Sequence, residues 1–211
     1  SRLSATKIQN ALVSGLNAAG VRVLLLGLVP TPMVYYATKT GITPNGVMIT
    51  GSHNPKDDNG LKIVINDKAV SGEELLSEFE NQAEIEQSEK NFEESELYPA
   101  YQQEINDKFS LNTEIKMVFD AGNGAAGVIA DTIFKSQGFE TISINKEPDG
   151  NFPNHHPDPS KEKNLEQLKK AVLDNHADIG FAFDGDGDRV GMITENGNSV
   201  LADHSIMILS K

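Results

Sequence analysis

Residues 178–194 read Asp-Ile-Gly-Phe-Ala-Phe-Asp-Gly-Asp-Gly-Asp-Arg-Val-Gly-Met-Ile-Thr. The apolar run Ile179–Phe183 enters a loop with three aspartates, and a second, largely apolar run covers residues 189–193. A short apolar run that is bounded by loop residues is typical of a strand buried in an α/β sheet. This stretch therefore predicts a strand that ends in an acidic loop, followed by a strand that returns into the same sheet.

Asp184, Asp186 and Asp188 stand at alternate positions with a glycine between each pair, which lets the backbone curl. Three carboxylates that turn toward one point repel each other, and a hard divalent cation such as Mg²⁺ or Ca²⁺ relieves that repulsion. Three protein ligands leave coordination positions open for a phosphate oxygen. Arg189 follows directly and is placed to bind phosphate in a bidentate manner. The loop therefore predicts a divalent cation site that works beside a phosphate group.

Two alternatives exist for this acidic loop. One is a solvated acidic turn, which gains nothing from three carboxylates so close together. The other is a calcium-binding EF-hand loop, with Glu195 at its twelfth position. We reject the EF-hand, because that loop needs glycine where this chain has Arg189 and because residues 189–193 are predicted to return into the sheet as a strand. A calcium-binding module remains the functional alternative based on this loop.

A second polar loop, residues 50–55, reads Thr-Gly-Ser-His-Asn-Pro and follows a predicted strand over residues 46–50. Ser52, flanked by glycine and His53 at the carboxyl end of a strand, is positioned as a nucleophile or phosphate carrier. Lys62 opens the next predicted strand, where it can return to the loop as a general acid/base or a phosphate clamp. The alternatives are an ordinary Gly-Ser turn and a solvated lysine.

A third loop has glycines at positions 122, 124 and 127, which match the pattern G-x-G-x-x-G between a predicted strand and a predicted helix. The pattern indicates a dinucleotide-binding domain, and the alternative is a tight turn without a ligand. His155 and His156 are adjacent in a loop with several prolines. Because adjacent side chains point in different directions, we expect the two histidines to make contacts within the loop and not to bind one metal ion together.

Strands and amphipathic helices alternate along both halves of the chain. This alternation implies right-handed crossovers, a mostly parallel sheet in each half and ligands at the carboxyl ends of the strands. Ser71 and Glu74 have the spacing of a capping box that opens an acidic helix. We predict an α/β fold class: two consecutive α/β units, residues 1–95 and 96–211, with mixed, mostly parallel sheets flanked by helices. The further predicted strands are residues 21–28, 61–65, 115–119 and 140–144, and the predicted helices include residues 5–16, a segment from Thr31, residues 127–136 and a segment that ends near Asn175.

The composition is that of a globular chain: 211 residues, 38% of them hydrophobic, no cysteine and a net charge of −13. Residues 71–114 hold 13 acids and 2 bases, and we interpret them as a solvated helix and interdomain connector. The negative charge disfavours nucleic acid as a partner. The absence of cysteine excludes disulfides and cysteine nucleophiles and fits a reducing compartment. The longest apolar run, residues 23–29, is too short to span a membrane, and no signal segment opens the sequence, so we expect a cytoplasmic protein.

These motifs together resemble the α-D-phosphohexomutases, most closely the bacterial phosphomannomutase/phosphoglucomutase branch. The resemblance is carried, in this order along the chain, by residues 47–55, 59–62, 120–127, 149–159 and 184–189. It implies that Ser52 is a phosphoserine and that Mg²⁺ is held by the three aspartates and a phosphoserine oxygen. It further implies that Lys62 is a general acid/base assisted by His53 and Arg189, and that the glycine turn near Gly122 is structural.

The reaction implied by the resemblance moves phosphate between the 1- and 6-positions of mannose or glucose. It passes through a hexose 1,6-bisphosphate, which also serves as activator. A phosphoglucosamine mutase of the same superfamily is the alternative. Family members have four domains, of which this chain resembles the latter part of the first and all of the second. We therefore expect a partial enzyme, inactive by itself. The segments expected outside it are an upstream strand with an arginine near the phosphoserine and the C-terminal domains that hold the sugar.

Overall fold

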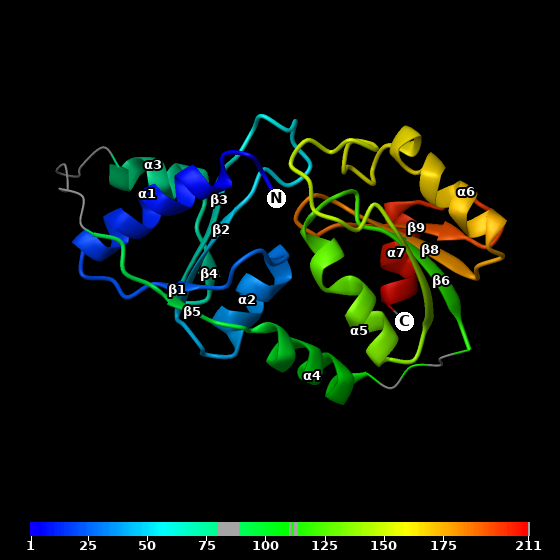
Figure 1. Ribbon diagram of the computed structural model, residues 1–211, viewed down its shortest axis with the longest axis horizontal. Helices are drawn as coiled ribbons and strands as arrows, with labels where there is room; N and C mark the ends of the chain where they lie inside the picture. The colour runs from blue at the N-terminus through cyan, green and yellow to red at the C-terminus, as the bar shows by residue number, and fades with distance from the viewer. Residues whose placement is uncertain (80–88, 110, 112–113, 211) are drawn as a thin grey trace.

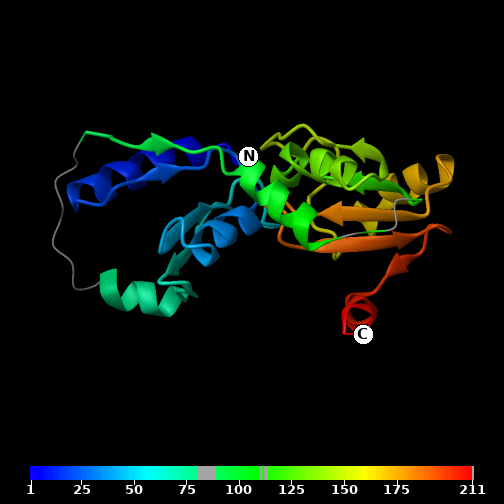
Figure 2. The same cartoon turned by 90° about the horizontal axis from the view of Figure 1, so that it is seen from below.

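A computed structural model describes residues 1–79, 89–109, 111 and 114–210 of the chain. Two units of helices and strands lie side by side, and helix α4 (Tyr98–Lys108) crosses between them in both views (Figures 1 and 2). The fold is of the predicted α/β class. None of the helices in the described part of the chain combines the length and apolar character that crossing a membrane requires.

The first unit contains a three-stranded sheet in the order β2-β3-β4 and a separate parallel pair, β1 with β5. The predicted strand over residues 21–28 is much shorter than expected, because β1 pairs with β5 over two residues only. The capping box is confirmed: the Ser71 N–H donates to Glu74 Oε2 (2.7 Å), and the Glu74 N–H donates to Ser71 Oγ (3.3 Å). The elements are α1 (Ala5–Ala18), β1 (Leu24–Leu25), α2 (Thr31–Lys39), β2 (Asn45–Ile49), β3 (Leu61–Ile65), β4 (Lys68–Ala69), α3 (Gly72–Phe79) and β5 (Glu93–Glu94).

The expectation of a mostly parallel sheet in this half is wrong for the three-stranded sheet, which is antiparallel throughout. The physical reason lies in the connections. A parallel pair needs a crossover of a dozen or more residues, usually a helix, whereas β2 and β3 are joined by the loop of residues 50–60 alone. The antiparallel pairing places the carboxyl end of β2 beside the amino end of β3, with Ile49 opposite Leu61.

The second unit is a five-stranded sheet in the order β10-β9-β8-β6-β7. β6 is parallel to both β7 and β8, while β9 and β10 continue the sheet in antiparallel fashion. The predicted helix over residues 127–136 is divided into a 3₁₀ turn and a short α-helix. The elements are β6 (Lys116–Asp120), η1 (Ala125–Val128), α5 (Ala130–Ser136), β7 (Glu140–Ile144), η2 (Glu162–Asn164), α6 (Glu166–Asp174), β8 (Ile179–Phe183), β9 (Val190–Thr194), β10 (Ser199–Val200) and α7 (Ala202–Leu209).

The central strands of this sheet are buried on both faces, which explains their nearly continuous apolar sequence. Successive side chains of a strand point to opposite faces. Val118 accordingly packs in the cluster that contains Leu168 and Val172 of α6, whereas Phe119 packs in a second cluster with Ala130 and Phe134 of α5. The two helices therefore cover opposite faces of the sheet (Figure 1).

A third hydrophobic cluster joins the two units. Met33 and Val34 of α2 share it with Leu97, at the start of α4, and with Ile129 at the start of α5. We expected residues 71–114 to form a solvated helix and connector. Leu97, within this segment, is only 5% exposed, so part of the segment packs against the core. Residues 80–88, 110 and 112–113 of that segment lie outside the described residues. The boundary between residues 95 and 96 stays a prediction.

The long loop between β7 and α6 contains the two adjacent histidines, which point in different directions as expected. His155 Nε2 lies 2.8 Å from Asp120 Oδ2, and its Nδ1 lies 3.0 Å from the carbonyl oxygen of His156. Both acceptors are oxygens, so both ring nitrogens donate when the ring is protonated. Burial by itself lowers the pKa of His155, but the hydrogen bond and charge of Asp120 outweigh it, and the pKa lies above its usual value.

Replacing Phe119 with alanine removes a side chain that is 0% exposed. We expect Phe119→Ala to lower the free energy of unfolding by about 3–5 kcal/mol, because it deletes buried apolar surface and leaves a cavity. Phe109→Ala, at the end of α4 and 53% exposed, is the matched control and should change it by no more than about 0.5 kcal/mol. Urea unfolding followed by circular dichroism measures both, and equal losses would contradict the assigned core.

The His155–Asp120 pair should make stability depend on pH. Because the folded pKa of His155 is raised, its contribution is complete below the unfolded pKa of about 6.5 and is lost as the pH rises through the higher folded pKa. The difference in unfolding free energy between the wild type and His155→Gln should therefore shrink as the pH rises above the unfolded pKa of about 6.5 and through the higher folded pKa. Urea titrations at a series of pH values measure it. A difference that stays constant with pH would argue against a charged pair.

Candidate active site

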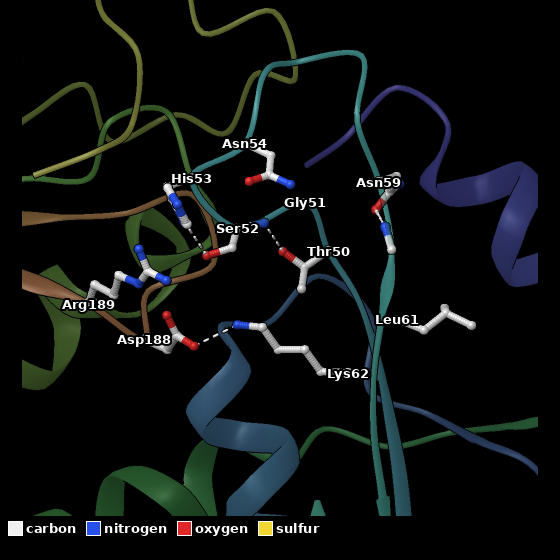
Figure 3. A pocket seen from close by; sticks show the side chains of 11 residues that line it. Thr50, Gly51, Ser52, His53, Asn54, Asn59, Leu61, Lys62, Asp188 and Arg189 are labelled. Carbon is white, nitrogen blue, oxygen red and sulfur yellow. Dashed lines mark hydrogen bonds and ion pairs between the residues drawn. The ribbon is translucent and has the colours of Figure 1, made fainter. Parts of the chain in front are cut away.

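Both ends of the loop between β2 and β3 in the first unit meet one loop of the second unit at a cavity of ≈ 390 Å³. Its lining consists of residues 50–54 after β2, residues 59–62 at the start of β3, and Asp188 and Arg189 after β8. Lys62 pairs with Met48 across the antiparallel ladder, which brings the lysine to the serine loop. The structure therefore gathers side chains from both units, as expected from loops at the carboxyl ends of strands (Figure 3).

Ser52 stands at the centre of this cavity in an uncommon backbone conformation. Its φ angle is 46°, in the left-handed region that residues other than glycine rarely adopt. Thr50 Oγ1 accepts the Ser52 N–H at 2.7 Å and supports this turn. The Ser52 hydroxyl donates to Asp184 Oδ2 at 2.7 Å, and its oxygen lies 3.3 Å from His53 Nδ1. The hydroxyl thus faces both the acidic loop and an imidazole.

Arg2 holds the serine loop, a role that was not predicted from the sequence. An arginine near the serine was expected only in a segment outside this chain. The Arg2 guanidinium donates to the carbonyl oxygens of Ser52 (2.7 Å), Asn54 (2.8 Å) and Pro55. The side chain packs so closely that a Cβ at Gly51 would lie 2.7 Å from Arg2 Cζ. No local pattern marks an arginine that acts on carbonyl groups fifty residues away, so the sequence offered no signal for it.

The acidic loop brings one oxygen from each of Asp184, Asp186 and Asp188 within 4.8 Å of one another. Asp184 and Asp186 are buried, and Asp188 lies at the surface. Asp184 Oδ1 accepts the N–H groups of Asp188 and Arg189, both at 3.1 Å, which curls the loop. Asp186 Oδ1 is buried without a hydrogen-bond partner. Hard oxygen donors with one unpartnered buried carboxylate oxygen fit a divalent cation.

The protonation of the buried aspartates follows from their surroundings. Burial, together with the charges of Asp186 and Asp188, raises the pKa of Asp184 to about 6. Burial acts in the same direction on Asp186, but hydrogen bonds from Lys62 and Thr31 outweigh it and lower the pKa of Asp186. Asp184 therefore holds a proton more readily than Asp186 does when no cation neutralises the loop.

Lys62 and Thr31 reach the acidic loop from the first unit. Lys62 Nζ donates to Asp186 Oδ2 (2.7 Å) and Asp188 Oδ2 (2.6 Å). Burial lowers the pKa of Lys62, yet the hydrogen bonds and charges of these two carboxylates outweigh it and raise the pKa overall. Thr31, at the start of α2, donates its hydroxyl to Asp186 Oδ2 (2.6 Å) and its N–H to the Asp186 carbonyl oxygen (2.8 Å). Lys62 was predicted from the sequence as a site residue, whereas Thr31 was not.

All the site residues that were predicted lie together. His53 and Arg189 line the same cavity as Ser52 and Lys62, and the Arg189 guanidinium faces it beside Asp188 (Figure 3). β9 follows Arg189 directly as the predicted return strand, which agrees with the rejection of an EF-hand. The geometry can therefore present a serine oxygen to a phosphate group between a cation site and three basic side chains.

The glycine turn after β6 is filled by protein and not by open space. A Cβ at Gly127 would lie 1.8 Å from the Lys146 carbonyl oxygen, and one at Gly124 would lie 2.7 Å from the Gly185 carbonyl oxygen. Glycine is needed at both positions because backbone from other segments approaches them. The turn therefore supports the acidic loop, which removes the structural basis for a dinucleotide-binding domain.

Comparisons with known proteins agree with this arrangement. The family description "Phosphoglucomutase/phosphomannomutase, alpha/beta/alpha domain I" matches residues 1–90, and "alpha/beta/alpha domain II" matches residues 99–197. The chain is 44% identical over 211 residues to a "Phosphomannomutase/phosphoglucomutase" of Pseudomonas syringae pv. tomato, with 99% of the chain and 45% of that protein covered. It is 40% identical to a "Phosphoglucomutase" of Neisseria gonorrhoeae, with 100% of the chain and 46% of that protein covered. The chain thus spans about half the length of the curated relatives that it matches.

A solved structure has the same fold over almost the whole chain. It is a phosphoglucomutase/phosphomannomutase family protein of Burkholderia thailandensis, with a TM-score of 0.91, 37% identity and coverage of 99% of this chain and 48% of that one. A second, a phosphomannomutase homologue of Thermus thermophilus, has a TM-score of 0.81 at 26% identity and covers 94% of this chain and 47% of that one. With matches to both domain descriptions and the site geometry in agreement, the chain belongs to the phosphoglucomutase/phosphomannomutase family.

Proposed function

We propose that the protein is a phosphohexomutase that moves a phosphoryl group between the 1- and 6-oxygens of mannose or glucose through a phosphorylated Ser52. The observation that carries this proposal is the position of the Ser52 hydroxyl, 2.7 Å from Asp184 in a cavity that also contains Lys62 and Arg189. In one half-reaction the P–O bond to Ser52 Oγ breaks as a sugar hydroxyl forms a new P–O bond, and the hydroxyl proton ends on the serine oxygen. The other half-reaction returns a phosphoryl group from the opposite end of the resulting hexose 1,6-bisphosphate, which also serves as activator.

The residues that would hold Mg²⁺ in this proposal are Asp184, Asp186, Asp188 and an oxygen of the phosphorylated Ser52. The unpartnered, buried Oδ1 of Asp186 supports this ligand set. When bound, the cation would neutralise the carboxylates and stabilise the charge that develops on the transferred phosphoryl group. The protein's contribution is to hold the serine oxygen against the acidic loop, in which Asp188 lines the cavity and Asp184 and Asp186 are buried.

Lys62, His53 and Arg189 take the proton and phosphate roles in this proposal. The raised pKa of Lys62 keeps its ammonium group charged, so it has a proton to give as a general acid. His53 Nδ1, 3.3 Å from Ser52 Oγ, is placed to exchange a proton with the serine oxygen. The Arg189 guanidinium lines the cavity and can bind two oxygens of one phosphate group.

The relatives guide the choice of sugar. Those at 44% identity bear the name phosphomannomutase/phosphoglucomutase, whereas a "Probable phosphoglucosamine mutase" of Methanosarcina barkeri is 36% identical. We therefore propose mannose and glucose phosphates as substrates. Sugar binding would be completed by the C-terminal domains of the intact protein.

The unit boundary at residues 95 and 96 belongs to the same proposal. So does a cytoplasmic location, which rests on the absence of cysteine in the sequence.

Phosphorylation of Ser52 is the direct test of this function. We expect mass analysis of the intact protein, incubated with Mg²⁺ and glucose 1,6-bisphosphate, to find one phosphoryl group on the peptide that contains Ser52. Ser52→Ala should lack it and should lower conversion of glucose 1-phosphate to glucose 6-phosphate by at least about a thousandfold, because the group that carries the phosphoryl is gone. Ser95→Ala, outside the cavity, is the control and should retain both properties. A phosphorylated site elsewhere, or turnover without Ser52, would refute the proposal.

The metal site can be tested without turnover. We expect Asp186→Asn to weaken Mg²⁺ binding by at least about tenfold in calorimetry, since a charged oxygen ligand becomes a neutral amide. Asp57→Asn is the matched control, because it removes the same charge from an exposed position on the serine loop. The control should bind Mg²⁺ nearly as the wild type does. Equal losses in both variants would mean that net charge, and not ligation, sets the affinity.

A further inference from the structure

Four consecutive carbonyl groups of the serine loop, residues 52–55, each accept a hydrogen bond from a side chain that lies elsewhere in the chain. Arg2 supplies three of these bonds. The fourth comes from the second unit: His156 Nε2 lies 2.6 Å from the carbonyl oxygen of His53. A carbonyl oxygen can only accept, so Nε2 carries the proton and donates. His156 thereby ties the serine loop of one unit to the long loop of the other.

The same long loop also supports Arg2. The Arg2 Cζ atom lies 5.0 Å from the ring centroid of Phe152, a distance that permits a cation–π contact. Phe152 is 8% exposed, so the surrounding protein packs against its ring. The neighbouring Gly150 allows the close approach, since a Cβ there would lie 2.3 Å from the Ser1 carbonyl oxygen. Segment 150–156 therefore reaches the serine loop directly through His156 and indirectly through Phe152.

The serine loop needs such support because of its own conformation. Ser52 has a positive φ, and backbone in this region persists only where the surroundings hold it. Inside the loop of residues 50–60, three backbone bonds contribute: Thr50 N–H to the Gly60 carbonyl, Asn54 N–H to the Gly51 carbonyl and Asp58 N–H to the Pro55 carbonyl. A loop that relaxed would carry the Ser52 hydroxyl away from Asp184, with which it now makes a 2.7 Å bond.

We propose that His156 is a positioning residue that holds the serine loop in its reactive conformation through the carbonyl of His53, with Phe152 supporting the same loop through Arg2. His156 contacts neither the cation ligands nor Lys62 in any hydrogen bond of the described residues. Its effect on turnover, which rests on the proposed mutase function, is therefore indirect. Loss of the bond should lower the fraction of molecules in which Ser52 is aligned, and so lower kcat with little change in KM.

The first measurement does not depend on the function. Hydrogen exchange of peptides that cover residues 50–60 is compared among the wild type, His156→Leu and His156→Gln in the intact protein. His156→Leu removes the donor and should speed exchange in this loop several-fold, with peptides of β6 and β8 unchanged. His156→Gln keeps an N–H donor of similar reach and should restore the wild-type rate. Equal effects of both variants, or none, would overturn the hydrogen bond as the cause.

The second measurement is steady-state turnover of glucose 1-phosphate by the same proteins. We expect His156→Leu to lower kcat by about three- to tenfold, the effect of one net hydrogen bond, with KM within about twofold. His156→Gln should recover most of kcat. Faster exchange with an unchanged kcat would overturn the catalytic consequence. An inactive wild type, without phosphorylation of Ser52, would refute the proposed function, while the exchange data would still decide whether His156 holds the loop.

Phe152 variants cover the case in which His156→Leu does not fold. Phe152→Leu keeps an apolar side chain but removes the ring beneath Arg2, whereas Phe152→Tyr keeps the ring. We expect the leucine variant to speed exchange in residues 50–60 and to lower kcat by at least about twofold, because a cation–π contact between two buried side chains is lost. The tyrosine variant should behave like the wild type. Wild-type exchange and kcat in Phe152→Leu would overturn the supporting role of segment 150–156.

Discussion

The mutual repulsion of three carboxylates is the constraint on which the rest of this structure depends. The oxygens of Asp184, Asp186 and Asp188 lie within 4.8 Å of one another, and two of the three side chains are buried where water cannot screen them. Donors compensate this charge: backbone N–H groups serve Asp184, and Lys62 and Thr31 serve Asp186. Burial, together with the repulsion from Asp186 and Asp188 that remains, raises the pKa of Asp184 to about 6. A cation is the natural completion of such a loop.

The side chains that donate to these carboxylates come from the first unit. The hydrogen bonds that compensate the negative charge of the acidic loop therefore also hold the two units together. Ser52, Lys62 and Thr31 all donate across this boundary. Hydrophobic packing fixes the boundary on another side, where Leu97 joins the cores of both units. The candidate active site is thus a property of the interface. Neither unit alone contains both the serine and the carboxylates that face it.

Much of the fold was predictable because it follows from local periodicity. The strand before each functional loop, the capping box at Ser71 and the helices that cover the second sheet were all found from spacing and turn residues. The parallel arrangement assumed for the first half was wrong for β2 and β3, because the direction of a strand depends on how its connection runs, and alternating apolar residues do not specify that. The glycine turn matched a nucleotide-binding pattern, yet its glycines accommodate backbone at Lys146 and Gly185.

The sequence by itself determined which residues are the candidates for chemistry: Ser52, Lys62 and the three aspartates stand in loops directly after or before short apolar strands, and such motifs are contiguous in the sequence. Only the tertiary structure decided how that chemistry is held in place. Arg2, Thr31 and His156 contact their partners across separations of 50 to 155 residues and act largely on backbone carbonyls or on one carboxylate oxygen. Every residue has a backbone carbonyl group. A side chain that donates a hydrogen bond to such a group therefore requires no particular residue type at the acceptor position, and the sequence shows no pattern there. The folded backbone alone brings such groups within hydrogen-bond distance.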